Sequence, residues 1–560
     1  MTRWGRAPVA QTVLHGLGWA VPYPVRVAEH HLDLIYIAQL ERYKLQRFAR
    51  WLRRKLGQAV DGREFGLQLL LVGAGIVIVR SGLPLVLFYL VWLAGGLWLA
   101  RRRVSLQVSQ RLVLTPRAAR LTVATFALAI GVLLVGAGGL QRMPLPGIRD
   151  AAPAGRVALA AAAGFALAGL LAPLTVLAGL ALTAPLEASI HRGFRGQAAR
   201  RMRAYPGQVV GITGSYGKTT TKLITAALLE TRHAVLKTPD GVNTTMGISR
   251  VVREDLRDSH RYFVVEAAAY GPGEIREVCA FLRPRLGVLT AVGVQHLERF
   301  GTPERIAEAK YELIASLPPD GAAIFNADDA VCVRLAERAR QEGRRVLRYG
   351  VEGAGRGLDV WAAELAMAGL GSRFSLMTPL GAAPVETPLL GRWNVSNILA
   401  AATVAVECGL SLEEIREAIA KLRPAPNRLE VRTEGGITKI LDIANANPVG
   451  ARMALEVLGK MPGVAKVLVT PGMVELGPIE AEENRRFGQA AAAVCDYVVL
   501  VGPEQTRPIQ EGLREAGLSP ERIIVVRRSD DVPDRLAELV RPGDVLLYEN
   551  RLPDTYLEVG

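Results

Sequence analysis

Two patterns of apolar positions divide the chain near residue 205. Before this point, apolar residues run almost without a break through four stretches, at Phe65–Val79, Gly82–Ala100, Leu121–Leu140 and Val157–Ala184. Beyond it, apolar runs of three to seven residues, such as Val209–Ile212 and Phe263–Val265, alternate with segments of helical periodicity. The first pattern predicts membrane-spanning helices, and the second predicts parallel α/β domains.

The four apolar stretches are expected to form a four-helix transmembrane region over residues 64–190. Gly82–Ala100 and Leu121–Leu140 are long enough to cross a bilayer, whereas Phe65–Val79 is short. Val157–Ala184 is longer than one crossing needs, so we expect a tilted or kinked span. These runs carry almost no charge, which excludes a soluble helical core and gives a transport pathway no support.

Arginines set the expected orientation of this region. They gather between Arg101 and Arg120, and again between Arg192 and Arg203 after the fourth span. Because positively charged loops stay on the inner side of a membrane, both segments are expected in the cytoplasm. The region then has both ends inside, in a multi-pass protein of the plasma membrane whose remaining domains are cytoplasmic.

Residues 1–63 form a basic N-terminal segment that is neither a signal peptide nor a span. Within it, His30–Leu56 mixes apolar side chains with seven Lys and Arg residues. The pattern fits a basic amphipathic helix on the inner membrane surface, and it fits a plain solvated helix equally well.

The net charge of +15 is unevenly distributed. Up to Tyr205 the chain has about 26 Lys and Arg against about 7 Asp and Glu, so the remainder is slightly acidic. The positive half is also the apolar half, which makes anionic lipid the better partner and argues against nucleic acid. The four cysteines form no C-x-x-C pair, so we expect reduced thiols in a reducing compartment.

The second half divides into two α/β domains. Pro424-Ala425-Pro426 is a natural hinge between residues 206–425 and 426–560. A glycine-rich insert over residues 344–390, with alternating apolar positions, predicts an antiparallel patch within the first domain.

A glycine-rich segment, Gly211–Lys222, lies between an apolar strand and a helical pattern. Such a turn directs backbone amides and a helix N-terminus at a polyphosphate, while Lys218 neutralises phosphate oxygens and Thr219 can hold Mg²⁺. The alternative is a glycine turn with an incidental Lys-Thr pair.

Four further clusters carry candidate chemistry. Glu266 ends an apolar strand, where a metal-holding or a structural carboxylate belongs. His296 follows another strand end, Lys310 lies on a helical pattern, and Asp442 precedes Asn445-Ala446-Asn447-Pro448, with Arg428 shortly before. Taken one at a time, each of these has a plain structural explanation.

In this order and spacing, the motifs resemble the Mur ligase family. The loop reads G-x-x-G-x-x-G-K-T-T from Gly211, with the first glycine one residue earlier than in the strict Walker pattern. The resemblance runs from about Pro206 to the C-terminus and is strongest to members that join D-alanyl-D-alanine to a muramoyl-tripeptide. It rests also on segments at 242–247, 271–275, 295–301, 326–329, 391–397, 427–430, 445–448 and 473–477.

The resemblance implies an ATP-binding central domain with a phosphate-binding loop and a Rossmann-like C-terminal domain. It implies ATP and two Mg²⁺ ions as cofactors, with Lys310 carbamylated. The implied catalytic residues are Lys218, Lys310, His296 and Arg428, and the implied metal ligands are Thr219, Glu266, His296 and Lys310. The implied nucleotide-binding residues are Gly214, Ser215, Tyr216, Gly217, Lys218, Thr219, Thr220, Asn394, Arg428 and Asp442.

The implied reaction is ATP-dependent amide formation, in which a carboxylate attacks the γ-phosphoryl group and an amine displaces phosphate from the acyl phosphate. Departures lie on the substrate side: Ala291, Trp393, Ala444, Val449 and Gly472 replace the residues usual in the family. The family's N-terminal uridine-nucleotide-binding domain also has no counterpart.

We therefore expect a bacterial, membrane-anchored ligase of cell-wall precursors, acting on a muramoyl-peptide or another carboxylate acceptor with D-alanyl-D-alanine as the default amine. A Mur-like ligase of another surface polymer, such as poly-γ-glutamate, and a degenerate membrane scaffold are the alternatives.

Overall fold

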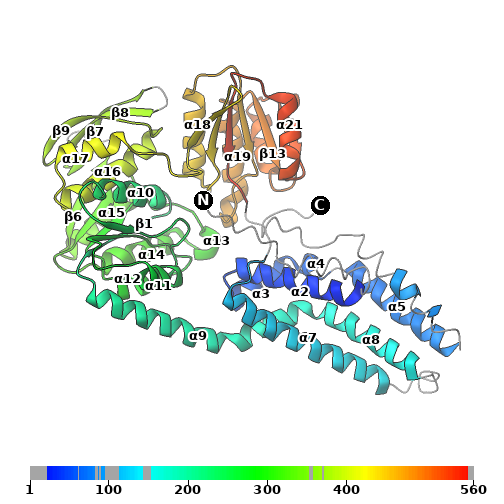
Figure 1. Ribbon diagram of the computed structural model, residues 1–560. Coiled ribbons are helices and arrows are strands. Elements are labelled where there is room, and N and C mark those ends of the chain that lie inside the picture. Colours follow the sequence, from blue (N-terminus) through cyan, green and yellow to red (C-terminus); the bar gives the residue numbers. More distant parts are fainter. Residues whose placement is uncertain are drawn as a thin grey trace. The chain divides into compact units, whose positions relative to one another are not determined.

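The computed structural model describes residues 22–60, 62–81, 86–87, 90–94, 112–142, 153–351, 357–368, 371–444 and 446–552. The chain forms two compact units, a helical unit that ends at Ile190 and an α/β unit that runs from His191 to Leu552 (Figure 1). Helix α9 is continuous through the boundary between them.

The helical unit consists of helices alone among its described residues. They are α2 (Pro22–Leu40), α3 (Leu45–Arg54), α4 (Leu56–Ala59), α5 (Gly62–Arg80), α7 (Pro116–Arg142), α8 (Pro153–Leu170) and α9 (Ala172–Ala204).

Two of these helices are long and apolar enough to cross a membrane, namely Pro116–Gly139 of α7 and the whole of α9. Gly66–Ile78 and Arg156–Leu170 are shorter apolar helices. The expected span Gly82–Ala100 lies largely outside the described residues. The expected single span Val157–Ala184 is two helices, α8 and α9, that meet at a turn at Leu171. The described residues therefore contain two candidate spans where we expected four.

The basic stretch His30–Leu56 is also two helices. A turn at residues 41–43, with positive φ at Arg42 and Tyr43, separates α2 from α3. The apolar face of α3 is buried, because Phe48 and Trp51 pack into a core with residues of α2, α7 and α9. The apolar face that a membrane-surface helix needs is thus used inside the protein, and the basic face of α3 remains exposed.

Close packing of small residues joins helices of this unit. A Cβ on Gly164 of α8 would lie 2.6 Å from the carbonyl oxygen of Leu133 on α7, so only glycine fits there. Polar groups are enclosed as well: the His31 ring lies 3.0 Å from Thr175 Oγ1, and Arg120 donates to buried Glu187 at 2.5 Å. Small residues at helix contacts and polar groups inside are typical of membrane bundles.

The central domain of the α/β unit is built on a nine-stranded sheet of order β2-β3-β1-β4-β5-β6-β7-β8-β9. Its strands are β1 (Gln208–Thr213), β2 (Val235–Lys237), β3 (Tyr262–Glu266), β4 (Leu286–Leu289), β5 (Ala322–Asn326), β6 (Arg345–Gly350), β7 (Val360–Ala368), β8 (Gly371–Thr378) and β9 (Gly381–Thr387). Its helices are α10 (Lys218–Leu229), α11 (Thr245–Glu254), α12 (Glu274–Leu282), α13 (Leu297–Phe300), α14 (Pro303–Ala315), α15 (Ala330–Gln341), α16 (Arg392–Glu407) and α17 (Leu412–Ala420).

Strands β1 to β6 are parallel, whereas β7, β8 and β9 form an antiparallel meander, as the alternating pattern of the insert predicts. The sheet has an apolar core on each face. Central β1 lies between β3 and β4, so the loop after β1 meets the ends of both neighbours. Ligands bind at such carboxyl edges of parallel sheets.

The C-terminal domain has a six-stranded sheet of order β10-β11-β15-β12-β13-β14. Its strands are β10 (Glu430–Glu434), β11 (Ile437–Asp442), β12 (Lys466–Thr470), β13 (Tyr497–Val501), β14 (Ile523–Val526) and β15 (Val545–Glu549), and its helices are α18 (Pro448–Lys460), α19 (Glu480–Ala492), α20 (Arg507–Glu515) and α21 (Val532–Leu539). Only the β10–β11 pair is antiparallel among these described strands. The Rossmann-like pattern expected after residue 426 is present.

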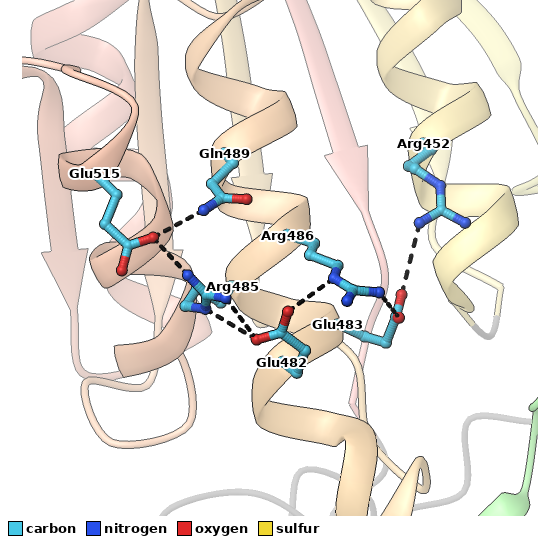
Figure 2. Close-up of polar contacts among 7 residues, drawn as sticks. All are labelled: Arg452, Glu482, Glu483, Arg485, Arg486, Gln489 and Glu515. Carbon is cyan, nitrogen blue, oxygen red and sulfur yellow. Dashed lines mark hydrogen bonds and ion pairs between the residues drawn. The ribbon is translucent and has the colours of Figure 1, made fainter.

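A network of surface ion pairs links three helices of this domain (Figure 2). Arg485 of α19 bonds Glu515 of α20 at 2.8 Å, and Arg452 of α18 lies 3.6 Å from Glu483 of α19. Exposed pairs of this kind contribute about 0.2–1 kcal/mol each. The domain therefore depends mainly on its apolar core for stability.

Candidate active site

The loop between β1 and α10 has the backbone conformation of a phosphate-binding turn. Gly214 and Gly217 have φ of +154° and +82°, and Gly217 caps the N-terminus of α10. A Cβ on Gly214 would lie 2.0 Å from Thr290 Oγ1, and one on Gly217 would lie 2.6 Å from Asn397 Oδ1. Only glycine fits at both positions, so the G-x-x-G spacing is a steric requirement of this turn.

The strand next to β1 holds the loop in place. Ser215 N donates to Ala291 O at 2.8 Å, and Ser215 Oγ pairs with the backbone of Gly293. Tyr216 packs its ring against that of Trp393, with the centroids 4.9 Å apart. The loop residues expected to bind nucleotide thus form one rigid turn.

Lys218 bends back over this turn. Its Nζ donates to the carbonyls of Gly214 and Ser215 at 2.7 and 2.9 Å. Burial lowers the pKa of Lys218 to about 8, although nearby Glu266 opposes the shift. A partly buried ammonium held by neutral carbonyls gains strongly from an anionic phosphate.

Glu266 and Thr219 meet where a metal is expected. Thr219 Oγ1 donates to Glu266 Oε2 at 2.9 Å, and Asn243 Nδ2 donates to Oε1 at 3.1 Å. Burial raises the pKa of Glu266, but Lys218, Lys222 and these hydrogen bonds outweigh it and hold the pKa below its usual value. The carboxylate is therefore charged at neutral pH.

This donor set fits Mg²⁺. Magnesium is usually bound by one or two protein oxygens together with substrate phosphates and water. The described residues contain no group of three or more His, Cys, Asp or Glu side chains that would hold a metal alone. Thr219 and Glu266 beside a phosphate loop match a magnesium site that is completed by substrate phosphates and water.

Lys310, on α14, is 3% exposed. Burial and the charge of Lys218 lower its pKa to about 7, while Glu266, Glu274 and Glu312 act in the opposite direction. A large fraction of this amine is therefore neutral, and hence nucleophilic, at neutral pH.

His296 caps α13 in the left-handed conformation (φ +61°) and contacts the C-terminal domain. Its Nδ1 pairs with Glu475, which also pairs with Arg299, and its ring lies 4.7 Å from that of Tyr270. Burial lowers the pKa of His296 and outweighs Glu475, and the charges of Lys310 and Lys218 lower it further. His296, Lys310 and Lys218 thus share one electrostatic environment.

Arg428 reaches the site from the C-terminal domain. Its Nη2 donates to Thr219 Oγ1 at 3.2 Å. Burial raises the pKa of Asp442 to about 6, opposed by Arg428. Arg428 therefore contacts the first turn of the helix after the phosphate-binding loop, and its charge acts on Asp442. That the two residues bind the nucleotide stays a prediction.

Asn394 and Thr220 are both buried. Asn394 Nδ2 donates to Leu390 O at 2.8 Å, one turn earlier. On the same helix, Asn397 accepts a hydrogen bond from Thr221 Oγ1 at 3.1 Å. Asn445 lies outside the described residues.

Four residues of the site escaped the sequence-based assignment, namely Asn243, Lys222, Asn397 and Glu475. Three of them lie within segments that carry the family resemblance, namely Asn243, Asn397 and Glu475. Their place in those segments was the sequence signal that could have assigned them to the site. Lys222 is fully buried within 3.5 Å of Glu266, and a lysine one turn into a helix gives no sequence sign of that.

Two family models of ligases match the α/β unit, which is named the ligase unit from here on. Residues 212–405 match the Mur ligase middle domain, and residues 427–548 match the Mur ligase, glutamate ligase domain. The UDP-N-acetylmuramoyl-tripeptide--D-alanyl-D-alanine ligase of Mycobacterium leprae is 33% identical over 365 residues, which cover 61% of this chain and 70% of the relative. The Escherichia coli ligase of that name is 34% identical over 53% of this chain and 65% of the relative.

Solved structures agree with these matches. MurF from Acinetobacter baumannii aligns with a TM-score of 0.59 and 28% identity, covering 65% of this chain and 78% of that one. MurF ligase from Thermotoga maritima in complex with ADP aligns with a TM-score of 0.57 and 27% identity, covering 66% and 81%.

Proposed function

The chain belongs to the Mur ligase family of ATP-dependent, ADP-forming ligases, and from this premise we propose that it joins an amine to a carboxylate of a cell-wall precursor at the membrane surface. The observation that carries the proposal is the convergence of Lys218, Thr219 and Glu266 at one sheet edge, with Arg428 of the second domain on Thr219.

In the proposed reaction, the loop amides and Lys218 bind the β- and γ-phosphates of ATP. Magnesium, held by Thr219 and Glu266, supplies charge neutralisation at the phosphates. His296 and Lys310 contribute to a second metal position. Arg428 stabilises negative charge that develops as the acceptor carboxylate attacks the γ-phosphoryl group and ADP leaves. The amine then attacks the carbonyl carbon of the acyl phosphate and displaces phosphate.

Carbamylation of Lys310 is part of the proposal. The reaction with CO₂ needs a neutral amine, and the pKa of about 7 provides one. It converts a buried amine, whose pKa the charge of Lys218 lowers, into an anion that the charge of Lys218 attracts, and it adds an oxygen ligand. Loss of activity in CO₂-depleted buffer, restored by bicarbonate, is the expected result.

The default substrates are a muramoyl-tripeptide and D-alanyl-D-alanine, by similarity to the relatives named above. The family positions at Ala444, Val449 and Gly472 are the reason to test other acceptors, because these residues lack the polar side chains usual there. A poly-γ-glutamate type of ligase remains the second enzyme to test.

The membrane location rests on the surface of the helical unit. Of the 23 large apolar side chains exposed in the described chain, 20 lie at or before Leu186. Several are on the candidate span of α7, including Val123, Leu134 and Val135 at 63–71% exposure. An apolar outer surface of this extent suits hydrocarbon. The proposal therefore includes that the helical unit anchors the protein in the plasma membrane through several spans and that the ligase unit lies in the cytoplasm.

A helical unit in place of the relatives' N-terminal part suggests that the acceptor is lipid-linked. This matches the loss of any segment similar to a uridine-nucleotide-binding domain before residue 206.

Phosphate release by the full chain in lipid nanodiscs tests the proposal. UDP-linked and lipid-linked muramoyl peptides are supplied with and without D-alanyl-D-alanine. Release is expected only when acceptor, amine, ATP and Mg²⁺ are all present, and Lys218→Ala should lower it by about 10³-fold. No release with any pair, from protein that binds ADP, would reject the ligase. Full activity on the UDP-linked peptide would reject only the lipid-linked acceptor.

A further inference from the structure

The end of α9 lies outside the family match yet packs into the ligase unit. The match begins at residue 212, whereas Ala198, Met202 and Tyr205 already belong to one core cluster of the central domain. The guanidinium of Arg253 on α11 lies over the ring of Phe194, with Cζ 4.1 Å from the ring centroid. Residues 191–204, named here the docking segment, are thus a structural part of this domain.

Two arginines of the docking segment pair with carboxylates of the central domain. Arg195 pairs with Glu277 in the first turn of α12. Arg201 pairs with Asp258 at 2.7 Å and donates to Leu256 O at 3.1 Å, in the connection between α11 and β3. The arginine side chains are 34% and 27% exposed, whereas Glu277 is 41% and Asp258 is 71% exposed, so the pairs match on the arginine side and differ on the carboxylate side.

Only one of the pairs leads to the metal position. The second oxygen of Glu277 accepts from Thr245 Oγ1 at 3.0 Å. Thr245 is the first residue of α11, two residues after Asn243, whose side chain donates to Glu266. The backbone of Asn243 is fixed as well, because Ala268 N donates to its carbonyl at 3.1 Å.

We propose that Arg195 is a positioning residue for the metal site and acts through Glu277, Thr245 and Asn243 on Glu266. Without Arg195, Glu277 can turn toward solvent, Thr245 loses a fixed partner, and the start of α11 is less restrained. Residues behind metal ligands tune affinity by orienting them. The inference rests on the proposed Mg²⁺-dependent ligase.

The test compares Arg195→Gln with Arg201→Gln in the full chain. Binding of Mn²⁺ in the presence of ADP, followed by electron paramagnetic resonance, reports metal affinity without turnover. We expect Arg195→Gln to raise the Mn²⁺ dissociation constant roughly two- to fivefold, the scale of a partly exposed ion pair. Arg195→Lys should restore most of the affinity, and Arg201→Gln should leave it unchanged.

Hydrogen exchange of residues 243–250 in the metal-free protein provides a second readout. Faster exchange there in Arg195→Gln, and not in Arg201→Gln, is expected. Equal changes in the two variants, or none in Arg195→Gln, would overturn the proposal. If the unmodified chain binds neither ADP nor Mn²⁺, the ligase proposal itself fails, and the two failures are distinguishable.

Discussion

The helical unit and the ligase unit differ in where they place large apolar side chains. In the ligase unit, three large apolar side chains are exposed among its described residues, Leu380, Val464 and Val525, and the cores on both sheets are filled with Val, Ile, Leu and Phe. In the helical unit, 20 large apolar side chains are exposed among the described residues, while the inside holds alanine, polar groups such as Thr175 and large apolar side chains such as Phe48.

The difference is the one expected if, as proposed above, a bilayer surrounds the helical unit and water surrounds the ligase unit. In water, burial of apolar side chains drives folding, so they collect inside. Between hydrocarbon and a helix there is no such gain, so close contact of small residues and hydrogen bonds hold helices together instead. Each unit should therefore respond differently to the same kind of substitution.

The largest effect is expected for a core residue of the ligase unit. Phe263 of β3 is fully buried, and Phe263→Ala should cost about 3–5 kcal/mol, from lost burial and the cavity left behind. Hydrogen exchange of the ligase unit, followed in increasing urea with ADP present, measures the free energy of unfolding. A cost below 1 kcal/mol would contradict a water-type core.

A charge on an exposed apolar position should separate the units most clearly. Leu134→Arg, on the candidate span of α7, is expected to cost about 3 kcal/mol if hydrocarbon surrounds it. Val464→Arg, at an 83% exposed position of the ligase unit, should change stability by less than about 0.5 kcal/mol. Yield in the membrane fraction and melting in nanodiscs compare the two, and equal tolerance would argue against a bilayer.

Helix packing in the helical unit can be tested with two glycines. Gly164→Ala should cost about 1–3 kcal/mol, because its Cβ would press on the backbone of α7. Gly138→Ala is the control, since nothing lies within 4 Å of its Cβ, and it should be neutral or stabilising. The melting temperature of the helical unit in detergent distinguishes the two variants. An unchanged melting temperature for Gly164→Ala would show that the close contact between α7 and α8 does not stabilise the unit.

The smallest effect concerns a polar group inside the ligase unit. Because burial raises the pKa of Asp442 from 3.8 to about 6, the folded protein binds this proton more tightly than the unfolded chain. This carboxyl therefore costs stability above about pH 6, and the cost is relieved as the pH falls toward 4. As the pH falls from 6 to 4, the free energy of unfolding of the wild type should rise by about 1–2 kcal/mol relative to that of Asp442→Asn. Urea titrations at each pH measure this difference. A constant difference between the two proteins would be the contrary result.

Much of the ligase unit could be predicted because its signals are local. The glycines of the loop have to be glycine for steric reasons, and the short apolar strands and the antiparallel insert follow from composition and periodicity. The hinge at residues 424–426 stays a prediction. Glu266, Lys218 and Thr219 were identified because each follows a strand end or opens a helix.

The residues that were missed act through contacts between distant segments. Glu475 matters because it meets His296, which is 179 positions earlier, and Lys222 because it is buried beside Glu266. The helical unit was less predictable for another reason. Continuous apolarity does not mark where a helix ends, so the turn at Leu171 within residues 157–184 left no trace in the pattern.

The docking segment also decides where the catalytic part of this protein can be separated from the rest. The family match starts at residue 212, which invites a cut near residue 206. Such a fragment would expose Ile248, Val251 and Val252, which now pack in one cluster with Ala198 and Met202. A fragment that begins at His191 keeps the docking segment packed on these residues. The part of the chain expected to fold on its own therefore begins earlier than the segment that matches the family model. Expression of both fragments would show whether sequence homology or core packing sets the boundary.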